Sequence, residues 1–192
     1  MSFRIALTLS VLLWVPFALP QAATFKGSPE APDFTLTRAD GGRYQLRSRP
    51  GRVVLLYFGF THCANVCPQA LGSLSGLLAR LTPTERSGLD AVFITVDPER
   101  DTPTQVRAFL SRFNADFIGL IPDEGELERL RQGYHLSARR IQEPGEPDYD
   151  MVHTDLIYVV GPGGRLRHAF FAGTGVDSML ADVRALLLEA PR

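Results

Sequence analysis

The chain has two cysteines, Cys63 and Cys67, and both lie in one short stretch, residues 62–68. In a helix, residues at i and i+4 lie on the same face, so the two thiols could share one metal ion or one bond. Single cysteines are often small buried residues without further chemistry. Two that fall together after an apolar run and before a proline favour a redox or metal site instead.

The elements around the cysteines predict reactive thiols. The apolar run at residues 53–58 is typical of a strand covered on both faces. Leucines at spacings of three and four follow, and they predict an amphipathic helix that begins at the cysteines: Leu71, Leu74, Leu77, Leu78 and Leu81. Reactive groups collect where a strand passes into a helix. The N–H groups at a helix start stabilise thiolate over thiol, so we expect lowered thiol pKa values.

The remaining pattern predicts an α/β domain, with a central mixed sheet covered by helices on both faces. Strands are expected at residues 33–36 and 43–46 as an N-terminal hairpin, at 91–96 and 117–121, and at 156–160 and 165–171 as a second hairpin. Further helices are expected at residues 106–113, 127–134 and 179–187. The Thr102-Pro103 pair supplies a cap for the first of these three helices.

The N-terminus indicates export. Arg4 is the single charge before an uncharged apolar stretch, residues 5–19, and Ala22-Ala23 follow that stretch. The stretch is shorter than the roughly 20 residues that a membrane-spanning helix needs, but the cleavage site is poor. We therefore interpret residues 1–23 as a signal peptide or an uncleaved membrane anchor. Both place the protein where free thiols oxidise unless a partner reduces them or a metal holds them.

Length and charge limit the other possibilities. Without residues 1–23, about 170 of the 192 residues remain, which suits one domain with a sizeable core. Twenty basic and 21 acidic side chains nearly cancel, and no basic run occurs, which argues against nucleic acid or an anionic membrane surface as partner. Residues 24–32, rich in proline and small residues, indicate a linker, and residues 33–192 then form the domain.

Three blocks of sequence resemble the Sco/SenC family of copper chaperones. Residues 58–68 are similar to the family's phenylalanine-rich strand that leads into two cysteines separated by three residues. Residues 93–103 are similar to its strand and loop after the first helix, and residues 149–154 to the segment that carries its histidine ligand. The blocks follow the family's order, and the resemblance extends from about Ala31 to the end of the chain. It implies a thioredoxin-like fold.

The resemblance also implies a ligand set and a role. It implies a copper ion bound by Cys63, Cys67 and His153, in a periplasmic protein that helps to assemble the dinuclear copper centre of cytochrome c oxidase. The implied partners are the copper-receiving oxidase subunit and other copper chaperones or thiol reductases. The chemistry agrees, because thiolates suit Cu(I) and imidazole suits both oxidation states. Structural zinc generally requires a fourth protein ligand. His153-Thr154 stands where thioredoxin-like reductases have a proline that faces the cysteines.

Two positions depart from the family's pattern. Ala64-Asn65 stand where Pro-Asp commonly follows the first cysteine, and Val152 stands where Asp commonly precedes the histidine. Both changes remove a carboxylate near the site. Since a carboxylate usually orients a ligating imidazole, Asp155 and Asp150 are the candidates to replace it.

Three functions compete for these residues. A copper-binding assembly factor needs His153 as well as the sulfurs. An exported thiol-disulfide reductase, which would keep a partner's copper-ligand cysteines reduced, needs only Cys63 and Cys67. A peroxide-reducing or redox-sensing relative would need a peroxide pocket, for which the sequence gives no sign.

The other residues that could take part in chemistry are interpreted mostly as structural. Met151 is expected to pack rather than to ligate. The charged residues 97–101 are interpreted as a solvated, helix-capping loop, and residues 143–150 as a mobile loop that leads to the candidate histidine. Three other histidines remain. His62 lies beside Cys63 and either tunes its thiolate or faces solvent, whereas His135 and His168 are expected to do neither.

Overall fold

The computed structural model describes residues 22–142, 144–145 and 148–190. The signal peptide or anchor that we expect at residues 1–23 therefore lies, except for its last two residues, outside the described part of the chain. No helix within the described residues combines the length and the hydropathy that crossing a membrane requires.

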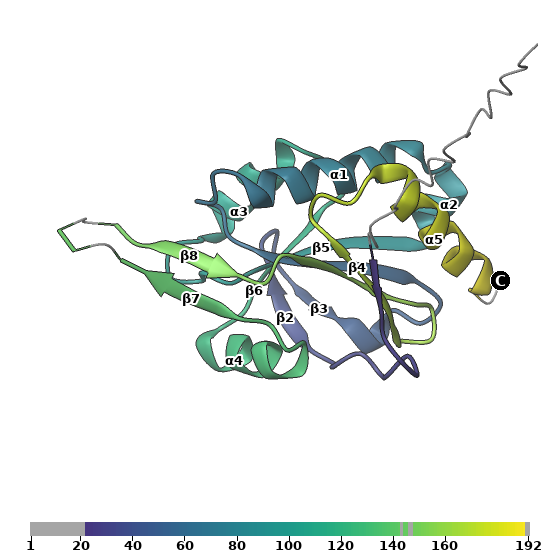
Figure 1. The fold of residues 1–192 in the computed structure, drawn as a ribbon, viewed down its shortest axis with the longest axis horizontal. Coiled ribbons are helices and arrows are strands. Elements are labelled where there is room, and N and C mark those ends of the chain that lie inside the picture. Colours follow the sequence, from purple (N-terminus) through teal and green to yellow (C-terminus); the bar gives the residue numbers. More distant parts are fainter. Residues whose placement is uncertain (1–21, 143, 146–147, 191–192) are drawn as a thin grey trace, which may run out of the picture.

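The centre of the fold is an eight-stranded mixed sheet (Figure 1). Its strands run in the order β1-β10-β9-β4-β5-β6-β2-β3, and only β4, β5 and β6 pair in parallel among them. Their bounds are β1 Ala22–Thr24, β2 Thr35–Arg38, β3 Arg43–Gln45, β4 Val53–Gly59, β5 Leu89–Thr95, β6 Ile118–Ile121, β9 Leu156–Val160 and β10 Leu166–Phe171. The predicted strands, including both hairpins, are confirmed within a few residues.

Helices cover both faces of the sheet, which confirms the predicted α/β class. The helical elements are η1 Leu46–Ser48, a 3-10 turn, with α1 Val66–Arg80, α2 Pro83–Ser87, α3 Pro103–Ser111, α4 Glu124–Gly133 and α5 Val176–Glu189. In Figure 1, α1, α3 and α5 lie on one side of the sheet and α4 on the other. The strand residues alternate accordingly, since Phe93 packs on Phe109 of α3 whereas Phe58 packs on Tyr134 beside α4.

Every residue of β4 and β5 is buried, because both faces of these strands are covered. Since β4 and β5 are parallel, the connection from β4 through α1 to β5 begins at the carboxyl end of the sheet, where α1 starts. The predicted cap of α3 is confirmed, since the Thr102 side chain accepts a hydrogen bond from the Gln105 N–H. The short helix α2 was not expected, although Thr82 and Glu85 form the capping box that marks its start.

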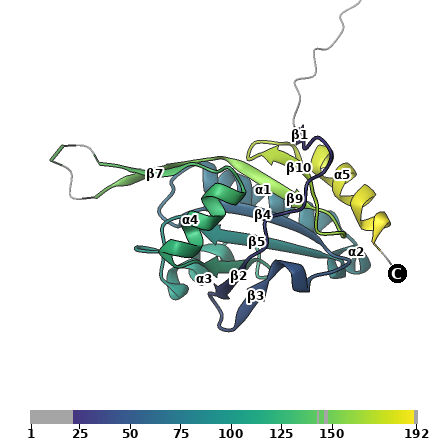
Figure 2. The same ribbon diagram turned by 90° about the horizontal axis from the view of Figure 1, so that it is seen from below.

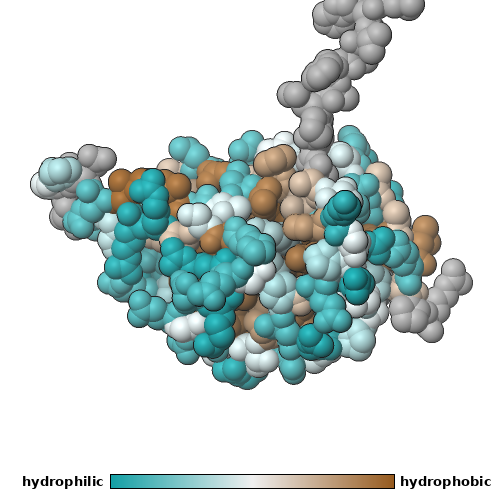
Figure 3. Space-filling model, turned by 60° about the horizontal axis from the view of Figure 1, so that its bottom comes forward, coloured by the Kyte–Doolittle hydropathy of each residue, from teal (hydrophilic) through white to brown (hydrophobic). Residues whose placement is uncertain are grey.

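A two-stranded hairpin projects from the body of the molecule (Figures 1 and 2). Its strands are β7 Ala138–Ile141 and β8 Asp150–His153, paired antiparallel so that Ala138 lies opposite His153. Figure 3 shows apolar surface gathered beside this hairpin. The sequence pattern did not predict it, because its two strands are only four residues long and mix charged with apolar residues without a clear alternation. The hairpin brings His153 back to the body at the carboxyl end of the sheet.

The segment that composition marks as a linker, residues 24–32, runs beside β10 and the turn before it. β1 pairs antiparallel with β10, and Phe25 stacks on Tyr158 with ring centroids 6.4 Å apart. The Ala31 N–H donates to the Gly164 carbonyl at 2.9 Å.

The amino end of the central strands carries a buried charge cluster. Asp90 of β5 is 4% exposed; Arg49 donates to both of its carboxylate oxygens, and Arg52 donates twice to Oδ1. The Tyr44 hydroxyl donates a further bond at 3.1 Å. Burial raises the pKa of Asp90, but the bonds from the two guanidinium groups outweigh it and hold that pKa below its usual value.

Candidate metal centre

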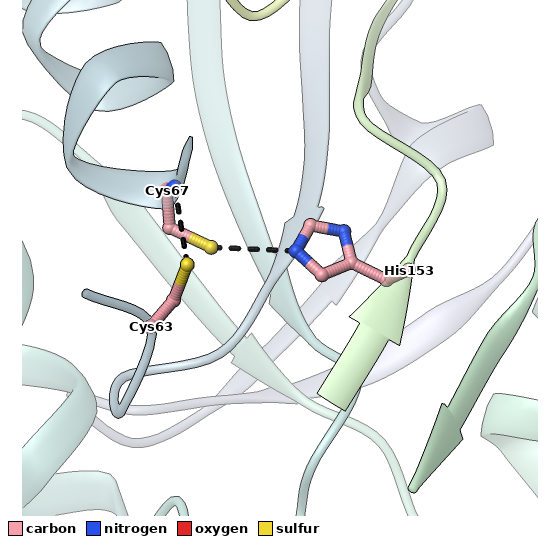
Figure 4. A group of neighbouring side chains, drawn as sticks. All are labelled: Cys63, Cys67 and His153. Atoms are coloured by element: carbon pink, nitrogen blue, oxygen red, sulfur yellow. Dashed lines mark hydrogen bonds between the residues drawn. The ribbon is translucent and has the colours of Figure 1, made fainter. Parts of the chain in front are cut away.

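Three segments converge at the carboxyl end of the sheet (Figure 4). Cys63 lies in the loop after β4, Cys67 is the second residue of α1, and His153 is the last residue of β8. One donor atom from each, two sulfurs and an imidazole nitrogen, lie within 4.8 Å of one another. The fold therefore places His153 opposite the cysteines, as the sequence resemblance implied.

The helix α1 begins at Val66, between the two cysteines, as expected of a helix that starts at them; Cys67 lies in its first turn and Cys63 precedes it. The backbone of Asn65 is not helical, and its side chain makes no capping bond. Instead the Cys67 N–H donates to the Cys63 sulfur at 3.4 Å. The sulfur thus occupies the place of a capping oxygen at the positive end of the helix.

The expectation of a lowered thiol pKa agrees with Cys63 and is wrong for Cys67. The Cys67 thiol donates to the Cys63 sulfur and, with help from His153 and backbone N–H groups, lowers the pKa of Cys63 to about 4 against the effect of burial. The same bond and nearly complete burial raise the pKa of Cys67. Both cysteines are free, and Cys63 is the more exposed. The pair therefore presents an accessible thiolate supported by a buried thiol.

His153 is held with one nitrogen aimed at the sulfurs. Its Nδ1 lies 3.0 Å from the Thr154 carbonyl oxygen, which can only accept, so Nδ1 carries the proton in the neutral ring. Nε2 then has a free lone pair and lies 3.5 Å from the Cys67 sulfur. Burial lowers the pKa of His153, but hydrogen bonds to the Cys63 thiolate and the Thr154 carbonyl outweigh it and raise that pKa overall.

Aromatic rings and the backbone fix the imidazole further. The Phe60 ring meets the His153 ring edge-on at 5.7 Å between centroids, and the Tyr57 ring does so at 6.2 Å. The Thr154 N–H donates to the Ser137 carbonyl at 2.8 Å, and the Ser137 N–H donates to the Thr154 hydroxyl at 2.9 Å. The end of β8 is thus tied to the start of β7.

Neither candidate carboxylate orients the imidazole directly. The Thr154 carbonyl does so instead. Asp150 accepts from its neighbouring Met151 N–H at 2.7 Å. Asp155 lies with a carboxylate oxygen 3.5 Å from the Tyr57 hydroxyl.

Gly59 is a site residue that the sequence reasoning missed. A Cβ at this position would lie 3.0 Å from the Cys67 sulfur and 2.9 Å from each of the Tyr57 and Phe93 rings. These distances leave no room for a side chain, so glycine at the end of β4 is what lets the Cys67 sulfur lie against the strand. The available signal was a glycine that interrupts an otherwise apolar strand four residues before Cys63.

The interpretation of residues 97–101 as a solvated loop is wrong for its two aspartates. Asp97 is 1% exposed and Asp101 is fully buried. Asp101 accepts hydrogen bonds from the Thr61 N–H at 3.0 Å, from the Thr61 hydroxyl at 2.6 Å and from the Thr95 hydroxyl at 2.6 Å. Because Thr61 lies two residues before Cys63, this carboxylate anchors the cysteine loop.

Asp97 anchors the hairpin in a similar way. It accepts from the Tyr149 hydroxyl at 2.7 Å and from Arg100 at 2.6 Å. The Tyr149 ring lies against the Arg100 guanidinium at 3.7 Å and against Arg140 at 4.6 Å. Tyr149, near the end of the stretch 143–150 that we expected to be a mobile loop, is therefore fastened to the body. Residues 143, 146 and 147 of that stretch lie outside the described part of the chain.

A second group of possible ligands, His62 with Asp97 and Asp101, also lies within 4.8 Å. Its buried carboxylates already accept bonds from hydroxyl and guanidinium groups, and His62 is exposed. Met151 is buried and lines the groove between the hairpin and α4. Among the described residues, the sulfurs and His153 are thus the group whose donor atoms are left open.

The open donor set fits a soft metal ion. Metal–sulfur bonds of about 2.3 Å place the donor atoms of a three-coordinate site about 4 Å apart, and the three atoms here lie within 4.8 Å. Two thiolates and one imidazole suit Cu(I), whereas Mg²⁺ and Ca²⁺ prefer oxygen. Only small movements of these side chains would be needed.

Comparisons with known proteins agree with the site. The SCO1/SenC family model matches residues 22–188. The chain is 34% identical over 148 residues to Protein SCO1 homolog 1, mitochondrial, of Arabidopsis thaliana, covering 76% of this chain and 43% of that protein. It is 34% identical over 148 residues to a putative copper-binding protein of Stutzerimonas stutzeri, covering 77% and 72%. The chain thus spans less than half of the Arabidopsis relative.

Solved structures give the same result. The structure of Bradyrhizobium japonicum ScoI with copper bound matches with a TM-score of 0.74 and 32% identity, over 82% of this chain and 99% of that one. BsSco, described as a member of the Sco family of cytochrome c oxidase assembly proteins with a disulfide switch, matches with a TM-score of 0.66 and 25% identity, over 84% and 95%. The thioredoxin-like fold that the sequence implied is confirmed.

Proposed function

The chain belongs to the SCO1/SenC family, and from this premise we propose that it binds copper through Cys63, Cys67 and His153 and delivers it during cytochrome c oxidase assembly. The observation that carries the proposal is the convergence of two sulfurs and the His153 Nε2 within 4.8 Å. The copper bound to ScoI of Bradyrhizobium japonicum supports the choice of metal. The family description of BsSco supports the role in oxidase assembly.

The three ligands have different tasks. Cys63 is ionised and partly exposed, so an arriving metal ion meets it first. The buried Cys67 thiol loses its proton when the metal binds, since thiolate is the ligand form. His153 needs no rearrangement of its proton, because the Thr154 carbonyl already holds it at Nδ1. The exposed side of Cys63 leaves a path by which a partner's ligands replace those of this chain.

The partner is proposed to be the copper-receiving subunit of cytochrome c oxidase. Other copper chaperones or thiol reductases would load the metal or keep the sulfurs reduced. The protein is proposed to work outside the cytoplasm, in the periplasm, either released or held by its N-terminal segment. Free thiols there need a metal or a reductant to remain reduced.

The unequal thiols support a second function, thiol-disulfide exchange. The Cys63 thiolate would attack a partner disulfide to form a mixed disulfide and release one partner thiolate. Cys67, after losing its proton, would attack the Cys63 sulfur, releasing the second partner thiolate and leaving a Cys63–Cys67 disulfide. A thiol donor would then return the pair to its reduced form. This reaction uses both sulfurs but not the imidazole as a metal ligand.

The test is an anaerobic Cu(I) titration of the reduced, exported protein against a chelator of known affinity. We expect one copper ion per chain, and an affinity that falls about 10–100-fold or more in His153→Ala, because loss of a direct ligand should cost at least as much as loss of its supporting groups. His62→Ala is the matched control, since this histidine adjoins Cys63 but lies outside the donor group. Equal affinity in His153→Ala and wild type would rule out the three-ligand site.

Oxidase assembly in cells separates the two functions. If delivery is the main role, His153→Ala should lose oxidase activity nearly as badly as Cys63→Ser, and added copper should restore part of it. If thiol exchange is the main role, His153→Ala should retain most activity, and an external reductant should rescue the cysteine variants better than copper. Near-normal assembly in His153→Ala at limiting copper would contradict delivery.

A further inference from the structure

An acidic side chain lies beside the metal donors without contacting them. Asp155 follows His153 by two residues and is half-buried, with one carboxylate oxygen 3.5 Å from the Tyr57 hydroxyl. The position before the histidine, where the family commonly has an aspartate, is held by Val152, which is 46% exposed. In this chain the carboxylate therefore follows the histidine, as Asp155, instead of preceding it.

Tyr57 connects this carboxylate to the donor group. Its ring is fully buried and meets the His153 ring edge-on at 6.2 Å between centroids. The Tyr57 hydroxyl also donates a hydrogen bond to the Cys67 sulfur, which acts to lower the pKa of that thiol against the larger effects that raise it. The Asp155 carboxylate thus lies at the same tyrosine hydroxyl that contacts Cys67, and its charge acts on His153. Because Asp155 is half-buried, its charge is screened less than that of a fully exposed carboxylate.

We propose that Asp155 tunes the bound copper, favouring Cu(II) over Cu(I) through its negative charge. The proposal rests on the copper-binding function above. Two thiolates and a neutral imidazole form a neutral site with Cu(II) and a site of one negative charge with Cu(I). A fixed negative charge nearby therefore repels the Cu(I) state more than the Cu(II) state. Asp155 acts on the ligands through space and through Tyr57, and not as a ligand.

The test compares the two oxidation states in Asp155→Asn, which keeps the shape and removes the charge. Cu(I) and Cu(II) dissociation constants are measured by chelator competition on the full exported protein, together with the midpoint potential of the bound copper. We expect the affinity for Cu(II) to fall about tenfold relative to that for Cu(I). This corresponds to a potential about 59 mV higher for a one-electron couple.

Three variants control the result. Asp155→Glu restores the charge and should return the potential toward the wild-type value. Asp150→Asn removes the carboxylate at the start of β8, which bonds the Met151 N–H, and should leave the ratio unchanged. Asp155→Ser is a second neutral variant for the case in which Asp155→Asn does not fold, and it should shift the potential in the same direction.

The outcomes distinguish this inference from the proposed function. If the wild type binds one copper ion but neutral variants leave the ratio of affinities unchanged, the tuning role is overturned and the copper function stands. Equal losses of both affinities would show a structural role only, and would also overturn it. If the wild type binds no copper, the proposed function itself fails.

Discussion

Two polar clusters lie at opposite ends of β4 and β5, and they differ in how completely their atoms are bonded. At the amino end, the Asp90 carboxylate accepts bonds from Arg49, Arg52 and Tyr44, the shortest of them 2.6 Å long. At the carboxyl end, the sulfurs of Cys63 and Cys67 have contacts of 3.4 and 3.5 Å. The first cluster has its bonding capacity filled by the protein, and the second retains open lone pairs.

The difference separates a stabilising cluster from a binding site. A buried carboxylate that is fully hydrogen-bonded and paired with two cationic side chains has its desolvation cost offset. Removing a partner exposes that cost again. Soft sulfur and an oriented imidazole lose little by remaining weakly bonded, and they gain strong bonds when a soft metal arrives. Changes at the amino end should therefore affect folding, and changes at the carboxyl end should affect binding.

Oxidation of the cysteines should have the largest effect, and only at the carboxyl end. A Cys63–Cys67 disulfide removes both thiolates, so Cu(I) binding should be lost entirely and should return on reduction. The measurement is chelator competition on oxidised and re-reduced protein. A Cys63→Ser/Cys67→Ser double variant under the same treatment is the control. Undiminished Cu(I) binding by the oxidised protein would place the metal elsewhere.

Substitution of Asp90 should have the next largest effect, at the other end. Asp90→Asn leaves Arg49 and Arg52 without their carboxylate, and we expect the free energy of unfolding to fall by about 2–3 kcal/mol, less than for a fully buried pair because both arginines are partly exposed. Urea unfolding measures this. Asp116→Asn, which removes an exposed partner of Arg86, should change stability by less than about 0.5 kcal/mol.

Copper affinity of Asp90→Asn tests whether the two ends are independent. We expect it to equal that of the wild type once the protein is folded, since no site residue contacts the cluster. A parallel fall in affinity and stability would mean that the two ends are coupled through β5.

Gly59→Ala should affect both properties moderately, because Gly59 belongs to the core and to the site. The added methyl group would crowd Cys67, Tyr57 and Phe93, and we expect a loss of about 1–3 kcal/mol of stability together with weaker copper binding. Gly72→Ala in α1, where nothing lies within 4 Å of the added methyl, should instead be neutral or stabilising. Unchanged copper affinity in Gly59→Ala would show that the Cys67 sulfur has more room than the structure gives it.

The smallest effect is expected from pH near neutrality. Because the pKa of Cys63 is lowered to about 4, its thiolate is already formed at pH 7 and is lost only as the pH falls toward that value. The rate of Cys63 alkylation by iodoacetamide should therefore change little between about pH 6 and pH 8, whereas an ordinary thiol of pKa about 8.5 reacts much faster as the pH rises over this range. A tenfold or greater rise over that range would contradict the lowered pKa.

Local patterns predicted an element correctly where burial dictates its residues, either on both faces, as in a central strand, or on one face, as in an amphipathic helix. The apolar run at residues 53–58 and the leucine spacing after Cys67 correspond to β4 and α1. The Thr102 cap was visible because its partner, Gln105, lies three residues away. The β7–β8 hairpin was not visible in this way, and the family resemblance implied only that its last residue, His153, lies opposite the cysteines.

The sequence by itself determined most strands of the central sheet, most of the helices and, through the resemblance, the three converging donors. The tertiary structure alone decided that Asp101 is buried and anchors Thr61, and that the Thr154 carbonyl orients His153 in place of a carboxylate. It also decided that Gly59 makes room for the Cys67 sulfur. Periodicity and capping depend on residues a few positions apart, whereas the bonding of a buried group depends on whatever the folded chain brings beside it, here across 40 positions between Thr61 and Asp101.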